Sequence, residues 1–340
     1  MMGAGACAQP YHSSTSAKQT ASPKTLGAKI STAKAGETIL LESGEYGPLA
    51  INGRRFDGPG IVIEPTPGAK ASFSAISIGG SEGVTVKGVD VAIAAAQYGV
   101  SVNSSSRVVL SHLTVHAAPK TSLSAMMLRN SHDVTVQDCD IHDVGFGINL
   151  LASDHVTISS NTFSDLQVDA IRGAASHVEV VGNRASSFHP HPGDHPDFIQ
   201  FWGGGAAGPS TANVIKDNVY ERGDGDVVQG IFLEDNDDVV ISGNALLGTM
   251  YNGIGLARVH RALVEDNFVQ GYDDMGTRII TRGQSSDVTI RNNVAQSIVN
   301  YMDGGKPNPN YKEEHNHSIR SVKVGVTRDL QAWLAKRSAP

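Results

Sequence analysis

The residues with the greatest capacity for chemistry lie in one short segment, 188–205, with the sequence FHPHPGDHPDFIQFWGGG. Within these eighteen residues stand three histidines, two carboxylates, an amide and a tryptophan, namely His189, His191, His195, Asp194, Asp197, Gln200 and Trp202. Imidazoles and carboxylates transfer protons near neutral pH, and an indole ring packs on apolar surfaces. The segment is therefore the first candidate for a catalytic or binding site.

The chain around this segment is a repeat of three alternating residues, two turn residues, an asparagine and a further strand. The repeated asparagines are Asn161, Asn183, Asn218, Asn244, Asn267 and Asn293, and the same position is held earlier by Val89, Leu113 and Cys139. Successive positions are 22–26 residues apart, except for the 35 residues between Asn183 and Asn218. The candidate segment occupies that one long interval.

A period in the low twenties with short strands predicts a parallel β-helix, whose alternating Val and Ile side chains point inward and stack on the next coil. An asparagine that recurs at a corner can bond turn backbone and the amide of its neighbour. Leucine-rich repeats share the period but need recurring leucines, which are absent. We expect an all-β, single-domain right-handed parallel β-helix, with the hand taken from that of parallel crossovers.

The expected domain boundaries are 1–22 for a signal remnant and flexible N-terminus, 23–300 for the β-helix and 301–340 for a C-terminal cap. Ser22 and Pro23 are typical of a helix start, and Leu26 and Ile30 would share its buried face. Thr38–Leu41 is the first expected strand. The short helix that starts near Ser22 would cover the open edge of the stack.

A second short helix is expected over 327–338, with Thr327 as its cap. Leu330, Trp333 and Leu334 fall on one face of this helix. We expect it to cover the far end of the stack, which makes Trp333 a packing residue.

Composition excludes several classes of protein. With 340 residues and a net charge of −7, the chain lacks the basic face of a nucleic-acid binder. No apolar run is long enough to cross a membrane. The small residues around Cys7, in Ala6-Cys7-Ala8, resemble a signal cleavage site and predict a secreted or periplasmic protein. Only Cys139 then remains, so no disulfide framework is available.

With these features in place, the chain resembles the pectate-lyase-like superfamily of right-handed β-helices. Its opening, AKAGETILLESGEYGPLAI (33–51), is similar to the start of alginate and chondroitin lyases of that fold. The resemblance covers about 23–300 and implies secreted or periplasmic action on a polysaccharide. Neither the signatures of pectate lyases and polygalacturonases nor the Asp-Pro-His motif of mannuronan epimerases is present, so the subfamily stays open.

Inward isoleucines that follow each corner place the candidate side chains on successive coils. They are Ile148, Ile171, Ile199, Ile231 and Ile254. Relative to them, the long interval carries six extra residues before Asp197 and seven after Trp202. Longer loops at a corner make a wall, and a walled groove on a rigid scaffold is a common place for a binding site.

Outward residues one and three positions after these isoleucines form two predicted columns. The first is Arg172, Gln200 and Phe232, and the second is Trp202 and Glu234. Asp169 and Asp197 would stack at the strand entrance, with Gln229 and Asn252 above them and with Tyr251 and Arg258 bordering the same area. An aromatic ring beside an Arg, an amide and carboxylates suits a sugar.

The preferred hypothesis is a polysaccharide lyase that cleaves a uronate-containing glycan by β-elimination. Arg172 and Gln200 would stabilise the sugar carboxylate, His195 would be the base with Asp197 orienting it, and Tyr251 would be the acid. The expected substrate-binding residues are Asp169, His191, Gln200, Trp202, Phe232, Glu234 and Arg258. No cofactor is required, and the oligomeric state is open.

Several alternatives remain at this stage. A glycoside hydrolase would use Asp169 with Asp197, or Asp197 with Glu234, as paired carboxylates. A non-catalytic glycan-binding spike or adhesin would use the loop only to shape a groove.

Other interpretations assign these residues to structure or to metals. Asp169 and Asp197 could bond corner backbone. The histidines at 189, 191 and 195 could tether the loop or bind zinc, and Asp224 with Asp226 could bind Ca²⁺ or form a turn. His132, His155 and His177 precede repeat strands at a regular corner, and we expect them to be surface residues.

Overall fold

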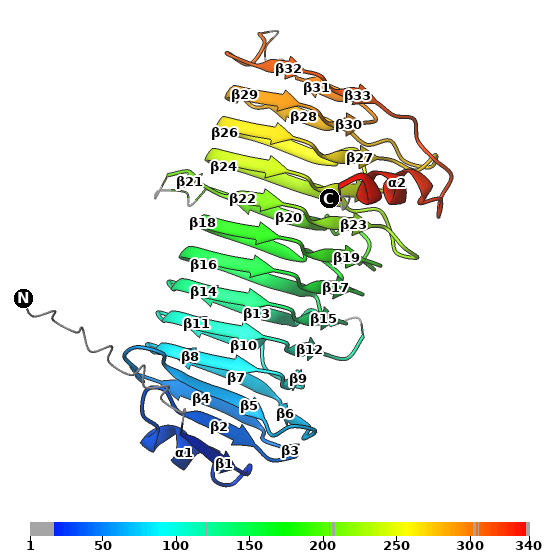
Figure 1. Ribbon diagram of the computed structural model, residues 1–340. Helices are drawn as coiled ribbons and strands as arrows, with labels where there is room; N and C mark the ends of the chain where they lie inside the picture. The colour runs from blue at the N-terminus through cyan, green and yellow to red at the C-terminus, as the bar shows by residue number, and fades with distance from the viewer. Residues whose placement is uncertain are drawn as a thin grey trace, which may run out of the picture.

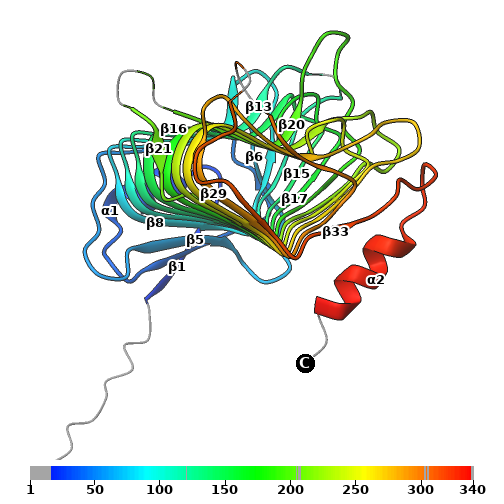
Figure 2. The same ribbon diagram turned by 90° about the horizontal axis from the view of Figure 1, so that it is seen from above.

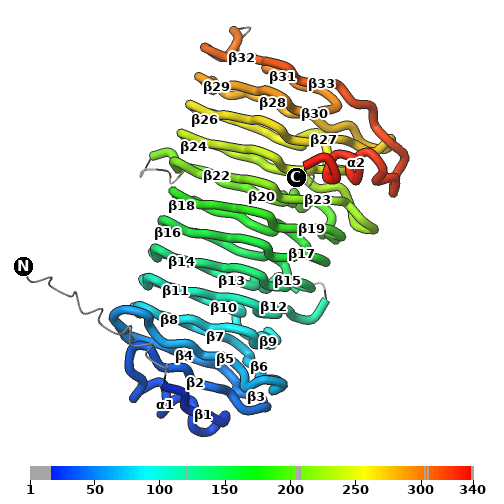
Figure 3. Tube along the Cα trace, in the orientation of Figure 1, coloured from blue at the N-terminus to red at the C-terminus, as the bar shows by residue number. Residues whose placement is uncertain are grey.

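The computed structural model describes residues 17–119, 121–203, 205, 208–301, 304 and 306–337. They form a right-handed parallel β-helix that advances along one axis from its N-terminal to its C-terminal coil (Figures 1 and 3). Each coil runs along three faces, named A, B and C in the order in which the chain meets them. The expected fold class is confirmed, and the signal-like motif at Cys7 lies outside the described residues.

The strands of each face pair in parallel with those of the neighbouring coils. Face A contains β1 Lys18–Ala21, β2 Thr38–Leu41, β5 Ile61–Pro65, β8 Glu82–Lys87, β11 Ser106–Ser111, β14 His132–Gln137, β21 Ser210–Thr211, β22 Val214–Lys216, β29 Ser286–Arg291 and β32 Lys312–Glu314. Face B contains β3 Gly44–Glu45, β6 Ala71–Phe73, β9 Asp90–Ala92, β12 Thr114–His116, β15 Asp140–His142, β17 Thr162–Ser164, β19 Arg184–Ser186, β23 Val219–Glu221, β25 Ala245–Leu247, β27 Phe268–Gln270, β30 Val294–Ala295 and β33 His317–Ser318. Face C contains β4 Pro48–Asn52, β7 Ala75–Gly79, β10 Tyr98–Asn103, β13 Ser124–Arg129, β20 Asp197–Trp202, β28 Ile279–Arg282 and β31 Ile298–Asn300.

Four long strands turn the corner from face C to face A without a break. They are β16 Phe146–Ser159, β18 Ile171–Val181, β24 Gln229–Ser242 and β26 Ile254–Glu265. The inward isoleucines expected on face C pair with one another across these coils and are all fully buried. The register that places the candidate side chains is therefore confirmed.

The repeated asparagines form a buried ladder at the corner between faces A and B. Each side-chain nitrogen donates to the amide oxygen of the next coil, as from Asn183 to Asn218 and from Asn218 to Asn244, both at 2.9 Å. The same oxygens accept the backbone N–H of the preceding asparagine. The ladder extends one coil further than expected, because Asn293 donates to Asn316.

A second ladder, which the sequence analysis did not identify, lies at the corner between faces C and A. The hydroxyl of Ser105 accepts the backbone N–H of Ser81, and those of Ser131 and Ser153 continue the pattern. In later coils Ser210 and Asn236 pair in register at this corner, and the amide of Asn213, three residues after Ser210, donates to Asn236 at 3.1 Å. Both corners are thus fixed by repeated side-chain hydrogen bonds.

The ends of the β-helix differ in detail from expectation. Strand β1 pairs with β2 before residue 23, and β32 and β33 continue the coils after residue 300. Helix α1, Leu26–Thr32, begins after Thr25 and not after Ser22, because the carbonyl of Ser22 closes a turn with both Thr25 and Leu26. Its buried residues are Leu26 and Ile30, as expected.

Helix α2, Arg328–Arg337, lies beside the coils and not across their end (Figures 1 and 2). Leu330 is buried, and Trp333 and Leu334 pack with it against residues of β25 and β27. The ring centroid of Trp333 is 5.7 Å from that of Phe268. The packing role of Trp333 agrees with expectation, whereas the helix covers a side of face B.

Candidate active site

The loop between β19 and β20 is held at its base by a buried aromatic cluster. Phe188 and Phe198 are fully buried, and each ring centroid lies 5.9 Å from that of Tyr220. The backbone N–H of His189 also donates to the carbonyl of Leu166 at 2.7 Å. The sequence from Phe188 to Phe198 therefore forms a loop with fixed ends, whose outer residues 191–195 are exposed.

Asp169 and Asp197 lie next to each other at the entrance to face C, and both are buried. The backbone N–H of Asp197 donates to Oδ1 of Asp169 at 2.8 Å, while Nη1 of Arg172 lies 3.0 Å from Oδ2 of Asp169. Neither carboxyl oxygen of Asp197 has a hydrogen-bond partner. Asp169 therefore both bonds backbone, as the structural interpretation held, and pairs with an arginine.

The electrostatics of this pair favour protonation. Burial raises the pKa of Asp169 to about 6, although the Arg172 guanidinium acts in the opposite direction. Burial, and then the neighbouring Asp169, raise the pKa of Asp197 well above the usual value of about 3.9. The protonated form of Asp197 is thus favoured beside the ion pair of Asp169 and Arg172.

His195 is exposed and lies between Tyr251 and Gln229. Its Nε2 is 2.9 Å from the hydroxyl of Tyr251, and its Nδ1 is 2.9 Å from the side-chain nitrogen of Gln229. The oxygen of the same Gln229 amide accepts from Asn252 at 2.5 Å, which fixes the orientation of the amide. Because an amide nitrogen only donates, Nδ1 accepts, and the proton of the neutral imidazole lies on Nε2 facing Tyr251.

This arrangement departs from the expected roles in one respect. Asp197 is the expected orienting partner of His195, but the ring nitrogens contact Gln229 and Tyr251. Asp197 is fully buried, with a backbone position one coil below Gln229. Gln229 has its expected place above Asp197 at the strand entrance. An amide at this position, next to a histidine in the loop, is the feature of the sequence that could have indicated their hydrogen bond.

Arg172 lies between two aromatic rings on the outer side of face C. Its guanidinium carbon is 5.0 Å from the ring centroid of Phe146 and 5.1 Å from that of Trp202. A planar guanidinium held by two rings and one carboxylate loses little freedom when it binds an anion. Gln200, half-buried, pairs in register with Arg172 on the next coil. The first predicted column is thus formed at these two positions.

Phe232, the third member of that column, is buried and not exposed as expected. The next coil has Gly255 at this position, where a Cβ would lie 2.6 Å from the Phe232 ring. The ring fills that space, and the guanidinium of Arg282 covers it at 5.1 Å from the centroid. Arg282, not Phe232, is therefore the surface residue here, and the sequence analysis missed it.

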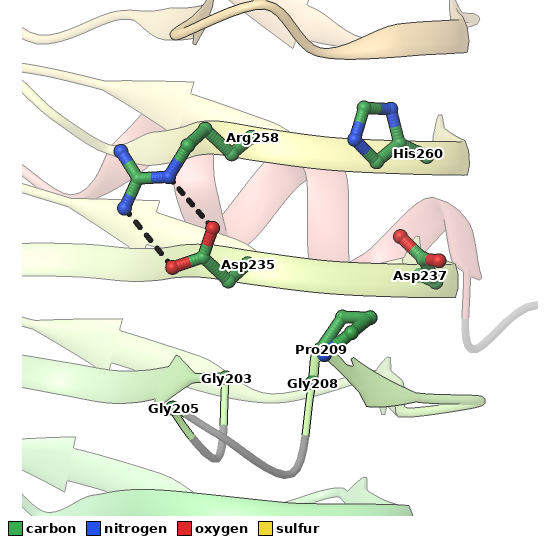
Figure 4. A pocket seen from close by; sticks show the side chains of 8 residues that line it. All are labelled: Gly203, Gly205, Gly208, Pro209, Asp235, Asp237, Arg258 and His260. Atoms are coloured by element: carbon green, nitrogen blue, oxygen red, sulfur yellow. Dashed lines mark hydrogen bonds and ion pairs between the residues drawn. The ribbon is translucent and has the colours of Figure 1, made fainter.

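Glu234 and Arg258 meet at the opposite edge of face C from Tyr251. Arg258 bonds Glu234 and Asp235, both at 2.6 Å, and these carboxylates raise the pKa of its guanidinium. Figure 4 shows the Arg258–Asp235 pair above a cavity of about 350 Å³, with Gly203, Gly208 and Pro209 on its other side. From Ile254 to Arg258 the strand advances roughly 13 Å, so Arg258 does not border Tyr251.

The remaining candidates of the loop are separated from one another. Nε2 of His189 lies 3.3 Å from Asp165, and the backbone N–H of His191 bonds Asp194. In the described part of the chain, the histidines at 189, 191 and 195 do not bring three ligand atoms together. Asp224 accepts from the hydroxyl of Ser187 at 2.6 Å.

Comparison with known proteins agrees with the fold. Residues 69–207 match the family model of the right handed beta helix region, and residues 198–321 match that of the periplasmic copper-binding protein NosD. No curated protein sequence matches the chain. Among the described residues, no helix has both the length and the apolar character needed to cross a membrane.

Solved structures of low sequence identity share the fold. A mannuronic acid specific polysaccharide family 6 lyase from human gut microbiota is 15% identical, with a TM-score of 0.57 and 94% of each chain covered. The mannuronan C-5 epimerase AlgE6 A-module of Azotobacter vinelandii is 10% identical, with a TM-score of 0.61 and 89% of this chain and 90% of that chain covered. An exopolygalacturonase from Thermotoga maritima is 9% identical, with a TM-score of 0.56 and coverages of 88% and 92%. These likenesses show the right-handed β-helix fold alone.

The copper suggested by one family model finds no ligand set in the matched segment. Among the described residues of 198–321, no three His, Cys, Asp or Glu side chains converge. The one cysteine described, Cys139, lies outside that segment and is buried. No step of the chemistry is therefore assigned to copper.

Proposed function

We propose that the protein is a secreted or periplasmic enzyme that cleaves a uronate-containing polysaccharide by β-elimination on face C. The observation that carries this proposal is the hydrogen-bonded pair of His195 and Tyr251 at the same strand entrance as the ion pair of Asp169 and Arg172. His195 bonds Gln229, which pairs in register with Asp197, and the backbone N–H of Asp197 bonds Asp169, the partner of Arg172. A proton-transfer pair and a cation are thus close together on one exposed face.

The chemistry of β-elimination fits these groups. Arg172 would face the sugar carboxylate and stabilise the negative charge that develops when the C5 proton leaves. Tyr251 is 42% exposed, and its phenolic oxygen accepts the Nε2–H of His195. The phenolate would take the C5 proton and then give it to O4 as the C4–O4 bond breaks, so the site returns to its first protonation state. In this assignment Tyr251 takes and returns the proton, and His195 positions Tyr251 through a hydrogen bond.

The hydrolase alternative has less support. Asp197 is fully buried and cannot reach a glycosidic bond, while Glu234 is paired with Arg258 at the other edge of the face. An inverting or retaining pair needs two carboxyl groups on either side of the scissile bond. The two neighbouring carboxyl groups, those of Asp169 and Asp197, lie below the surface. Asp169 contacts Arg172, so a role in positioning this arginine fits the pair better than a role as acid and base.

The first substrate to test is polymannuronate, because two of the similar structures belong to proteins named for mannuronic acid and mannuronan. We expect unsaturated uronate ends, detected by ultraviolet absorbance and mass spectrometry, from uronate-containing polymers and not from neutral ones. Hydrolysis would instead add one water to the products. Running the reaction in D₂O adds a second readout, since deuterium at C5 without cleavage would indicate epimerisation.

Tyr251→Phe and His195→Asn test the assigned residues. We expect each to lower turnover by about 10²–10⁴ with an unchanged melting temperature, because general acid–base groups contribute this much. His189→Gln is the matched control, since it changes another histidine of the same loop that contacts Asp165. Full activity in both site variants would remove the proposed site, and binding of every polymer without product would favour a glycan-binding module.

A further inference from the structure

Three side chains with metal-ligating atoms converge at the corner between faces C and A, away from the proposed active site. Asp154 and His155 lie on β16, and His177 lies on β18, one coil further along. Asp154 pairs in register with Ser176, which places the two histidines on neighbouring coils. His155 and His177 are both exposed, in agreement with their expected place on the surface.

The two histidines share the two oxygens of one carboxylate. Nδ1 of His155 is 2.8 Å from Oδ2 of Asp154, and Nδ1 of His177 is 2.7 Å from Oδ1. The rings stack with their centroids 4.7 Å apart and their planes 13° from parallel. One ligand atom from each residue lies within 4.8 Å of the others, which no other group of three achieves in the part of the chain described.

We propose that Asp154, His155 and His177 bind a divalent first-row transition metal ion such as Zn²⁺ or Cu²⁺. Two imidazole nitrogens and one carboxylate oxygen are donors that these ions prefer, whereas Ca²⁺ and Mg²⁺ prefer oxygen alone. Metal–ligand distances of about 2.0–2.2 Å place neighbouring donors roughly 3 Å apart, close to the observed nitrogen–oxygen contacts. Small side-chain movements would bring the three donors around one ion.

The site would keep an open coordination position and lies beside a cavity. Three protein ligands leave room for water or an external ligand on a four-coordinate ion. Asp154 also lines a cavity of about 330 Å³, whose other walls include Ser176, Pro209 and Ser210. Pro209 and Ser210 belong to the longer segment after Trp202, and these two residues would border access to the metal.

The position of the residues separates this proposal from other features of the molecule. Residues 154–177 lie outside the segment 198–321 that matches the copper-binding family model. His195 and Tyr251 lie at the corner between faces B and C, at the other edge of face C. The proposal rests only on the convergence of Asp154, His155 and His177.

A second stacked histidine pair supplies a control within the same chain. His116 and His142 stack at 5.2 Å with their planes 4° from parallel. Each has its own carboxylate, since His116 contacts Asp90 at 3.2 Å and His142 contacts Asp143 at 2.8 Å. This pair resembles the proposed site in its rings but lacks the shared carboxylate, so it should bind no metal tightly.

The test uses the full chain without an affinity tag, after treatment with a chelator. Zn²⁺ is titrated by calorimetry, and Cu²⁺ is followed by electron paramagnetic resonance, which detects coupling to ligand nitrogens. His155→Asn and His177→Asn are the appropriate variants, because both histidines have φ of +51° and asparagine tolerates the left-handed region. His142→Asn is the matched control.

We expect one saturable site in the wild-type protein and two nitrogens in the Cu²⁺ spectrum. Loss of either histidine should weaken Zn²⁺ binding by at least about 10–100-fold, the cost commonly seen when only an outer-shell partner is lost. His142→Asn should bind as the wild type does. Absence of saturable binding, unchanged affinity in both variants, or an equal loss in His142→Asn would each overturn the proposal.

Discussion

Two columns of buried polar side chains run along the same coils, and they differ in how their hydrogen bonds are completed. At the corner between faces A and B, each asparagine from Asn161 to Asn293 donates to the next, and the oxygen of Asn161 accepts the backbone N–H of Cys139. At the entrance to face C, the column of Asp169, Asp197, Gln229 and Asn252 leaves both carboxyl oxygens of Asp197 and the amide oxygen of Asn252 without partners.

The difference separates support from chemistry. Buried polar groups in native proteins are almost always hydrogen-bonded, so unpaired atoms require a specific explanation. In the second column, Asp169 contacts Arg172 and Gln229 bonds His195. The buried polar groups of this column therefore bond side chains on the outer side of the coil. Perturbed carboxyl pKa values next to such groups are typical of functional sites. We interpret the first column as scaffold and the second as the base of the site.

The largest expected effect comes from breaking the scaffold column with Asn218→Leu. The substitution removes the acceptor of the Asn183 backbone and side-chain nitrogens, and the donor to the carbonyl of Val180. Each buried group left unpaired costs about 1–3 kcal/mol of unfolding free energy. A clear fall in melting temperature with unchanged turnover per folded molecule is expected. Asn103→Leu, at an exposed position, is the control, and equal melting temperatures in the two variants would contradict the interpretation of the ladder.

The second effect concerns how stability depends on pH. A carboxyl group whose pKa is higher in the folded protein than in the unfolded chain binds more protons when folded, so its contribution to stability falls as pH rises. For Asp169 this contribution falls between about pH 3.9 and about pH 6, the pKa values in the unfolded and folded states, and the loss in unfolding free energy is roughly 3 kcal/mol. The pKa of Asp197 is raised well above the usual value, so Asp197 causes a further loss of stability at higher pH.

Asp197→Asn replaces the neutral acid with a neutral amide of the same shape. We expect its melting temperature to equal that of the wild type near pH 4 and to exceed it at pH 8, where the wild type must ionise or hold the buried proton. Thermal unfolding of both proteins across this range measures the difference. A variant that is less stable than the wild type at pH 8 would show that Asp197 is ionised and partnered in the folded protein.

The comparison also explains what the sequence could and could not predict. The scaffold follows from local patterns, because alternating Val and Ile and a recurring asparagine are visible at a fixed period. The inward isoleucines gave the register, and with it the neighbours Arg172 and Gln200. The serine ladder escaped notice because Ser81, Ser105 and Ser131 are common turn residues with no distinctive pattern.

The geometry of the site depends on side-chain directions that no period encodes. The burial of Phe232 results from a glycine on the next coil and an arginine, Arg282, that arrives from two coils away. In the same way, the contact of His195 with Gln229 joins an exposed loop residue to a strand of the next coil, which the spacing of the repeat does not encode. The convergence of His155 and His177 on Asp154 arises from corner conformations on separate coils.

The smallest expected effect, and the one that bears most directly on the site column, is that of Gln229→Glu. The glutamine is buried, accepts from Asn252 and donates to Nδ1 of His195. A glutamate of the same shape can still accept from Asn252. As an acceptor, it would favour the neutral imidazole tautomer that carries its proton on Nδ1, and Nε2 would then have no proton to donate. The Tyr251 oxygen would then lose its donor at Nε2. We expect turnover to fall roughly 10–100-fold with little change in KM, less than the loss of the Tyr251 hydroxyl itself.

Steady-state kinetics on an active uronate polymer would measure this effect, with the melting temperature as the check on folding. If His195 were the base and acted through Nε2, the glutamate would increase its basicity and turnover would hold or rise. Gln229→Glu therefore distinguishes a histidine that holds the tyrosine from a histidine that takes the proton. In the scaffold column the corresponding change, Asn244→Asp, should alter stability and leave kcat per folded molecule unchanged, since Asn244 contacts only the neighbouring asparagines and backbone. A fall in kcat there comparable to that of Gln229→Glu would mean that the two columns are not separate in function.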